Sequence, residues 1–127
     1  MKSAPKVLVL DDDENILLAF QDFLKGEGCT MVATPAPKEA LEVLEKEKFD
    51  LLITDLRLNM ESGVTFVLHA KRLQPDTPII VITGYPDTVS EAELKSYGAE
   101  YLFVKPLELK ELQRAVRSCL QRNEKMN

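Results

Sequence analysis

Five side chains suited to phosphoryl chemistry follow short apolar runs of this sequence. Asp11 and Asp12 come directly after VLVL, Asp55 follows LLIT, Thr83 follows IIVI and Lys105 follows LFV. Carboxylates that lie close together raise one another's pKa unless a cation sits among them, and hard anionic oxygen ligands suit Mg²⁺ or Mn²⁺. In such a site Asp55 would be the nucleophile, the divalent ion and Lys105 would clamp a phosphoryl group, and the Thr83 hydroxyl would hold one of its oxygens.

The apolar runs that precede these side chains have the length and composition of buried parallel strands. They lie at residues 7–10, 51–53, 79–82 and 102–104, and a weaker run at 30–33 suits an edge strand. Apolar residues recur at helical spacing over residues 16–24, 40–44, 64–68 and 109–120, and less regularly over 87–97. Gly28 and Gly98 stand where the first and fourth helices must end, a place that commonly needs a residue at positive φ.

This alternation of strand and helix predicts an α/β fold of the flavodoxin-like (βα)5 type. We expect a five-stranded parallel sheet in the order 2-1-3-4-5, with helices on both faces and right-handed crossovers. In such sheets ligands bind at the carboxyl ends of the strands, where the strand order reverses. Asp11, Asp12 and Asp55 follow the first and third strands, which flank that point. The 127 residues fit a single domain, with a core over about residues 5–122.

Composition excludes several other classes of protein. The net charge of -5 disfavours direct nucleic-acid binding. No apolar run approaches the roughly 18 residues that span a bilayer, and the chain opens without a signal-peptide segment, so we expect no membrane association and a cytoplasmic location. Cys29 and Cys119 lack metal-ligand spacing, and His69 is the single histidine, which argues against a zinc site or a histidine-dependent triad.

The motifs VLVLDDDEN, LLITDLRL, IIVITG and FVKP, in this order and spacing, resemble the receiver domain of bacterial two-component response regulators, the CheY-like fold. The resemblance covers about residues 5–122. It implies that Asp11, Asp12, Asp55 and the backbone carbonyl of Arg57 bind Mg²⁺, and that Asp13 caps the first helix. It also implies that a sensor histidine kinase, a phosphotransfer protein or a small phosphodonor phosphorylates Asp55.

By the same resemblance, Thr83 and Lys105 contact the phosphoryl group and sense its presence, and the peptide bond between Lys105 and Pro106 is cis. The domain would be a switch that catalyses only its own phosphorylation and dephosphorylation, so it is not expected to be an enzyme in the usual sense. Its fourth helix, fifth strand and fifth helix would form the signalling face, a possible dimer surface that also contacts an unknown downstream protein or domain.

The sequence departs from the family pattern in two places. Gly63 follows Asp55 by eight residues as the pattern requires, but LRLNMES stands where a proline-glycine pair is common. Leu102 occupies the position of the usual switch aromatic, and Tyr101, one residue earlier, should point to the opposite face of its strand. We therefore expect switching by movement of a loop and the fourth helix, with little aromatic gating.

Three residues beside the site are candidate modulators of the lifetime of the phosphoryl group. Arg57 and Tyr85 each follow a site residue by two positions and could overhang the acyl phosphate, whereas Gly84 leaves space for the phosphoryl oxygens. This arrangement predicts slow autodephosphorylation.

Three alternative functions fit the sequence less well. A degenerate receiver would act as an interaction module without phosphorylation. A haloacid dehalogenase-like phosphatase would use Asp11 as nucleophile and Asp13 as general acid, but it needs an acidic pair at a strand end after the lysine strand and leaves Asp55 without a role. A flavodoxin-like nucleotide binder would need a glycine-rich or Ser/Thr-rich loop where this chain has three aspartates.

Overall fold

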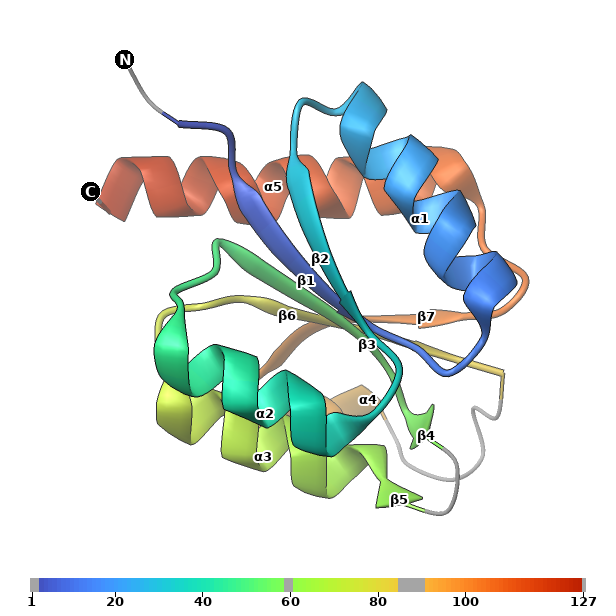
Figure 1. Cartoon of the computed structure of the whole chain (residues 1–127), viewed down its shortest axis with the longest axis vertical. Coiled ribbons are helices and arrows are strands. Elements are labelled where there is room, and N and C mark those ends of the chain that lie inside the picture. The colour runs from blue at the N-terminus through green and yellow to red at the C-terminus, as the bar shows by residue number, and fades with distance from the viewer. Residues whose placement is uncertain (1–2, 59–60, 85–90, 127) are drawn as a thin grey trace.

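The centre of the molecule is a five-stranded parallel β-sheet, shown by a computed structural model that describes residues 3–58, 61–84 and 91–126 (Figure 1). Its strands are β1 (Lys6–Leu10), β2 (Thr30–Thr34), β3 (Leu51–Asp55), β6 (Ile79–Thr83) and β7 (Ala99–Val104). They are arranged in the order β2-β1-β3-β6-β7, and every neighbouring pair is parallel. The predicted order 2-1-3-4-5 is therefore confirmed, with the weakly apolar strand β2 at an edge.

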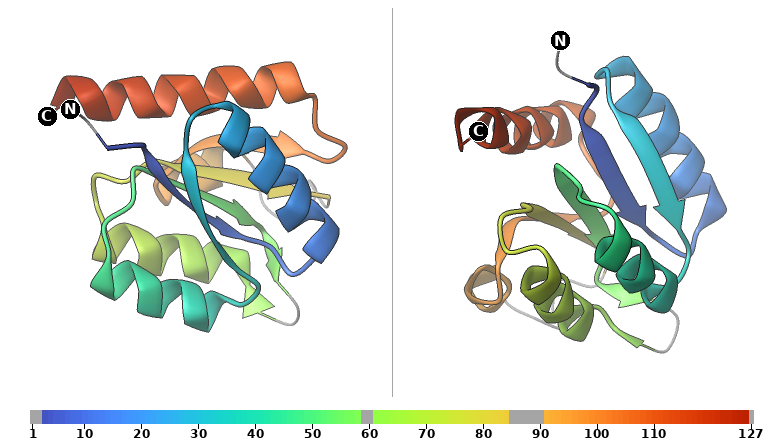
Figure 2. Two further views of the ribbon diagram at one scale, coloured as in Figure 1. Left: turned by 45° about the horizontal axis from the view of Figure 1, so that its top comes forward. Right: turned by 60° about the vertical axis from the view of Figure 1, so that its left-hand side comes forward.

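Helices cover both faces of this sheet, as the alternation predicts (Figures 1 and 2). They are α1 (Glu14–Gly26), α2 (Pro37–Lys46), α3 (Gly63–Leu73), α4 (Glu91–Ser96) and α5 (Leu109–Met126). Helices α1 and α5 pack on one face, and α2, α3 and α4 pack on the other. None of the helices in the described ranges has the length and apolar character to span a bilayer.

The alternation of side chains along each strand divides the core into two layers. In β1, Val7 and Val9 are buried against α1 and α5, whereas Leu8 and Leu10 are buried against the opposite layer of helices. The central strands β3 and β6 are buried along their whole length. This two-sided burial explains why their sequences are continuous apolar runs rather than alternating ones.

The structure adds detail to the sequence-based expectation at β7, at α4 and in the loop after β3. Strand β7 begins at Ala99, three residues before the predicted start, and its pairing with β6 is irregular between Ile79 and Ile80. Helix α4 is confirmed over Glu91–Ser96, and the predicted residues 87–90 before it lie outside the described ranges. Two short strands, β4 (Arg57–Leu58) and β5 (Glu61–Ser62), form an antiparallel pair that was not predicted.

The end of α1 is tied to α5 by a charged contact. The Nε of Arg117 and the Nε2 of Gln113 donate to the two carboxylate oxygens of Glu27, over 2.7 and 2.9 Å. The Glu27 side chain is 10% exposed and that of Arg117 is 60% exposed. Hydrogen bonds from Arg117 and then Gln113 hold the pKa of Glu27 below its ordinary value of 4.5.

The Glu27 contact predicts a pH-dependent contribution to stability. Because the pKa of Glu27 is lowered by folding, its contribution is present above about pH 4.5 and is lost as the pH falls through the folded-state pKa. We expect Glu27→Gln to lower the free energy of unfolding by ~0.5–1 kcal/mol at neutral pH, and by nearly nothing at acid pH. Urea titrations at both pH values would test this, with the exposed Glu42→Gln as control. An equal loss at both pH values would contradict it.

Candidate functional site

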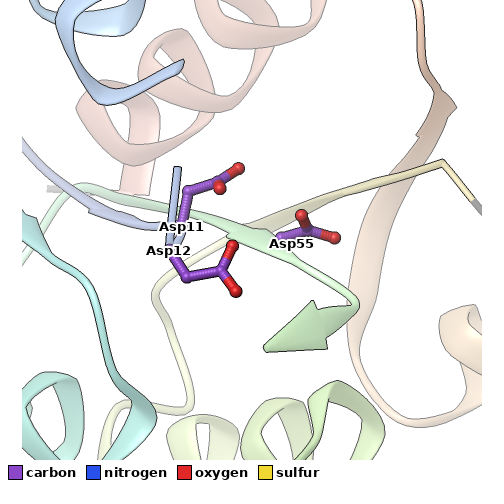
Figure 3. Close-up of side chains that lie close together, drawn as sticks. All are labelled: Asp11, Asp12 and Asp55. Atoms are coloured by element: carbon purple, nitrogen blue, oxygen red, sulfur yellow. The ribbon is translucent and has the colours of Figure 1, made fainter. Parts of the chain in front are cut away.

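Three carboxylates meet at the carboxyl edge of the sheet. Asp11 follows the last residue of β1, Asp12 comes next, and Asp55 is the last residue of β3 (Figure 3). One oxygen from each lies within 4.8 Å of the others. Asp11 and Asp55 are buried, whereas Asp12 is exposed, so the cluster opens to solvent on one side. The predicted convergence of these aspartates is thus present in the structure.

A lysine from the end of β7 completes the charge pattern. The Nζ of Lys105 lies 2.9 Å from an Asp55 oxygen and 3.6 Å from an Asp11 oxygen. The Lys105 side chain is 27% exposed, and those of Asp11 and Asp55 are 4% and 8% exposed. One partly buried ammonium therefore faces two buried carboxylates.

Burial and charge oppose one another in this cluster. Burial raises the pKa of Asp11, and the neighbouring Asp55 and Asp12 charges raise it further, against the backbone N–H of Asp13 and the charge of Lys105. Burial alone would lower the pKa of Lys105, but its hydrogen bond to Asp55 and the charges of both buried carboxylates outweigh burial and raise it. The site is thus short of positive charge.

The ends of β6 and β7 are held together beside these carboxylates. Thr83, the last residue of β6, is 1% exposed, and its carbonyl accepts the backbone N–H of Lys105 over 2.7 Å. The peptide bond between Lys105 and Pro106 is cis, which confirms the expectation from the resemblance. Backbone contacts thus place the chain at Thr83 directly beside the lysine that contacts Asp55.

The start of α1 also supports the site. The side chain of Asp13 accepts the backbone N–H of Asn15 over 2.9 Å, so it caps α1 as expected. Its own backbone N–H donates to an Asp11 oxygen over 2.9 Å. Asp13 therefore orients an acidic neighbour and does not join the cluster itself.

The loop after Asp55 contains a contact that the residue types did not indicate. The N–H of Leu56 donates to the carbonyl of Ile82, and the Leu56 carbonyl accepts the N–H of Gly63, over 3.1 and 2.9 Å. A Cβ on Gly63 would lie 2.1 Å from that carbonyl oxygen, so only glycine allows the approach. These contacts join backbone atoms, so the side chains give no indication of them. The spacing of eight residues between Asp55 and Gly63 is the sequence feature that points to this contact.

Leu102, at the switch position, and its neighbour Tyr101 lie on opposite faces of β7, as predicted. Leu102 packs with the α2, α3 and α4 layer, whereas Tyr101 packs with the α1 and α5 layer. The Tyr101 hydroxyl donates to the Ser118 hydroxyl of α5 over 3.3 Å, and its ring stacks on Phe103. A tyrosine held in this way is directed away from the α4 side of the strand.

Of the three candidate modulators of the phosphoryl lifetime, Gly84 and Arg57 lie within the described residues. Gly84 is exposed, and a Cβ placed there would lie 4.0 Å from Lys105 Cδ. Arg57 begins β4, where its backbone pairs with Ser62. Tyr85 lies outside the described residues. His69 is an exposed residue of α3, and both cysteines are buried.

The fold and this arrangement of residues define a class of protein. The family model described as the response regulator receiver domain matches residues 7–117. The chain belongs to this family, whose members are signalling modules of two-component systems. Neither the phosphatase nor the nucleotide-binder alternative gains support from this membership.

Individual relatives agree with this assignment. The chain is 29% identical over 114 residues to the transcriptional regulatory protein ZraR of Escherichia coli, a match covering 90% of the chain and 26% of ZraR. The chain therefore spans about a quarter of the length of the curated relatives it matches. A CheY-like receiver domain protein from Methanospirillum hungatei is 26% identical, with a TM-score of 0.87 and coverage of 98% of this chain and 100% of the other.

A second solved structure is informative about chemistry in a relative. It is a response regulator protein from Burkholderia pseudomallei that carries a phosphorylated aspartic acid, a calcium ion and citrate. The two chains are 27% identical, with a TM-score of 0.80 and coverage of 96% of this chain and 72% of that one.

Proposed function

We propose that this domain is a phosphoacceptor whose Asp55 receives a phosphoryl group from a histidine kinase, a phosphotransfer protein or a small phosphodonor. The observation that carries the proposal is the buried Asp55 carboxylate at a strand end, with Lys105 Nζ at 2.9 Å and Asp11 and Asp12 beside it. The phosphorylated aspartic acid of the Burkholderia relative supports the same chemistry.

The donor set fits a divalent cation. All the side-chain ligands are carboxylates, two of them are buried, and Lys105 alone leaves the cluster short of positive charge. Mg²⁺ prefers such oxygen ligands, and Mn²⁺ shares the preference. Asp11, Asp12, Asp55 and the backbone carbonyl of Arg57 would hold the ion, which when bound would neutralise charge on the transferring group.

The residues of the chain have separate parts in the transfer. A carboxylate oxygen of Asp55 forms a bond to phosphorus as the bond between phosphorus and the donor's leaving group breaks. With a phosphohistidine donor, the leaving nitrogen keeps the electron pair. Lys105 Nζ, already beside Asp55, would pair with a phosphoryl oxygen, and the Thr83 hydroxyl would hold another.

The transfer would serve signalling. The phosphorylated site would alter the surface formed by α4, β7 and α5, which would contact a downstream protein or domain or a second copy of the chain. Leu102 occupies the switch position, and the Tyr101 hydroxyl is hydrogen-bonded to Ser118. We therefore propose that the conformational change on phosphorylation proceeds through the loop that follows Thr83 and through α4. Reorientation of the Tyr101 ring on phosphorylation would contradict this route.

Intact mass spectrometry tests the phosphoacceptor assignment directly. Incubation with acetyl phosphate and Mg²⁺ is expected to add one phosphoryl group to the parent, and the adduct should be lost in Asp55→Asn and with EDTA. The matched control Asp50→Asn changes an aspartate at the opposite end of β3 and should retain the adduct. A folded parent that forms no adduct would favour the degenerate receiver, an interaction module without phosphorylation.

The lifetime of the phosphoryl group is a separate prediction. We expect autodephosphorylation to be slow, because Arg57 and Tyr85 follow Asp55 and Thr83 by two positions in the sequence and their side chains would then restrict the attacking water. Replacing both with alanine should then shorten the half-life of the adduct, followed by mass after the phosphodonor is removed. An unchanged half-life would show that shielding by these side chains is the wrong explanation.

A further inference from the structure

Helix α4 is held by fewer buried side chains than the neighbouring helix α3. Its six residues include one buried side chain, Leu94, which is fully covered. By contrast, the side chains of Phe66, Val67 and Ala70 of α3 are all buried. Because Leu94 is the one buried side chain among residues 91–96, a tilt of this described part of the helix would expose little apolar surface and would cost little.

The carboxyl end of α4 is fixed to the turn that follows it. The N–H of Tyr97 donates to the carbonyls of Glu93 and Leu94, each over 3.1 Å, and the N–H of Gly98 donates to Lys95 over 3.1 Å. Gly98 has a φ of 114°, a conformation that few other residues adopt without strain. The chain then enters β7 directly.

Lys71 of α3 lies against this turn. A Cβ placed on Gly98 would be 2.5 Å from Lys71 Cγ, so the lysine stem packs directly beneath the glycine. The Nζ of Lys71 donates to the carbonyls of Thr77 and Pro75, over 2.8 and 3.4 Å. One side chain therefore joins α3, the loop after α3 and the turn between α4 and β7.

We infer that Lys71 pins the carboxyl end of α4 through Gly98, so that α4 acts as a lever that tilts about this end when Asp55 changes state. The amino end of α4 is the end connected to the site, because residues 84–90 join it to Thr83. The inference rests on the proposed phosphoacceptor function. It assigns to Lys71, which lies outside the phosphoacceptor site, a positioning role in the output.

Paired spin-label distances test which end of α4 moves. One label is placed at the exposed Glu42→Cys of α2, and the other at Ala92→Cys or Ser96→Cys, which lie one helical turn apart on α4. The native cysteines are buried, so the added ones label selectively. Each pair is measured with Mg²⁺ alone and with Mg²⁺ and beryllofluoride, whose binding is verified by bound-fluoride NMR signals that Asp55→Asn abolishes.

The lever predicts different results at the two positions. Beryllofluoride should shift the Ala92 distance by about 2 Å, a typical helix displacement in switching proteins, and leave the Ser96 distance unchanged. In Lys71→Ala the Ser96 distance should shift as well, whereas the exposed control Lys38→Ala should behave like the parent. Lys71→Met keeps the stem and loses the ammonium, so we expect a smaller effect, and it replaces Lys71→Ala if that variant does not fold.

The outcomes separate the two proposals. If beryllofluoride does not bind, the phosphoacceptor assignment fails, and the lever fails with it. If it binds but Ser96 moves as far as Ala92, or neither moves, the lever alone is wrong. Unchanged Ser96 distances in both Lys71 variants would likewise overturn the role of Lys71.

Discussion

Replacing Gly63 with alanine is expected to destabilise the protein by ~1–3 kcal/mol and to slow phosphorylation of Asp55. The added Cβ would lie 2.1 Å from the carbonyl oxygen of Leu56, 2.5 Å from its carbonyl carbon and 2.6 Å from its Cα, so backbone must move. That movement breaks the hydrogen bond between Gly63 and Leu56 and displaces the residue next to the phosphoacceptor. Stability and reactivity should therefore fall together.

Gly26→Ala is the matched control for this substitution. Gly26 ends α1, and a Cβ there meets no atom within 4 Å. Alanine at this position should leave stability unchanged or raise it by up to ~1 kcal/mol, because glycine is a poor helix former. Urea unfolding gives the stability of each variant, and the rate of adduct formation with acetyl phosphate gives reactivity. A Gly63→Ala protein with parental stability and rate would show that the loop adapts.

The sequence allowed prediction of the sheet and of the main site because both follow from local patterns. A parallel sheet brings the carboxyl ends of its strands to one edge, so residues after apolar runs could be placed together without knowing any side-chain conformation. Asp11, Asp55 and Lys105 come from three such ends, and their contacts at 2.9 and 3.6 Å confirm the placement.

Features that depend on distant pairs could not be predicted in this way. The contacts of Glu27 with Gln113 and Arg117 join residues 86 and 90 positions apart, and nothing in their local sequence specifies the partner. The ribbon of β4 and β5 is local and could not be predicted for a different reason: it pairs only two residues in each strand, too few to give a periodic signal. Lys71 is typical of an exposed helix position, and its contact with Gly98 depends on how α3 and α4 pack.

Leu102 stands where the family usually has a switch aromatic, and the nearest aromatic residue before it is Tyr101. Whether Tyr101 can take over the switch role depends on the face of β7 to which it points. The structure places the neighbouring Tyr101 in the other layer of the core, bonded to Ser118, so an aromatic one position away is not a substitute for the usual one. The strand's alternation alone sufficed for this prediction, because a shift of one residue changes the face.

Removing the charge of Lys105 should raise the affinity of the site for Mg²⁺ and lower its affinity for beryllofluoride. In Lys105→Met without metal, Asp11 and Asp55 lose the cation that faces both, and their mutual repulsion is left uncompensated. Breaking a fully buried pair costs ~3–5 kcal/mol, and since Lys105 is 27% exposed we expect a smaller loss of ~1–3 kcal/mol. Thermal unfolding without Mg²⁺ measures this loss, and Lys95→Met, which removes an exposed ion pair of α4, should cost little.

Mg²⁺ should then restore stability to Lys105→Met more strongly than it stabilises the parent. The divalent ion no longer competes with an ammonium for the same carboxylates, so Mg²⁺ affinity should rise by about tenfold, well within what one nearby unit charge can supply. Beryllofluoride affinity should instead fall, because the phosphoryl mimic loses the donor that Lys105 provides. A variant that was merely less stable would not bind Mg²⁺ more tightly. Weaker binding of both ligands would therefore mean that Lys105 shapes the site without acting on the phosphoryl group.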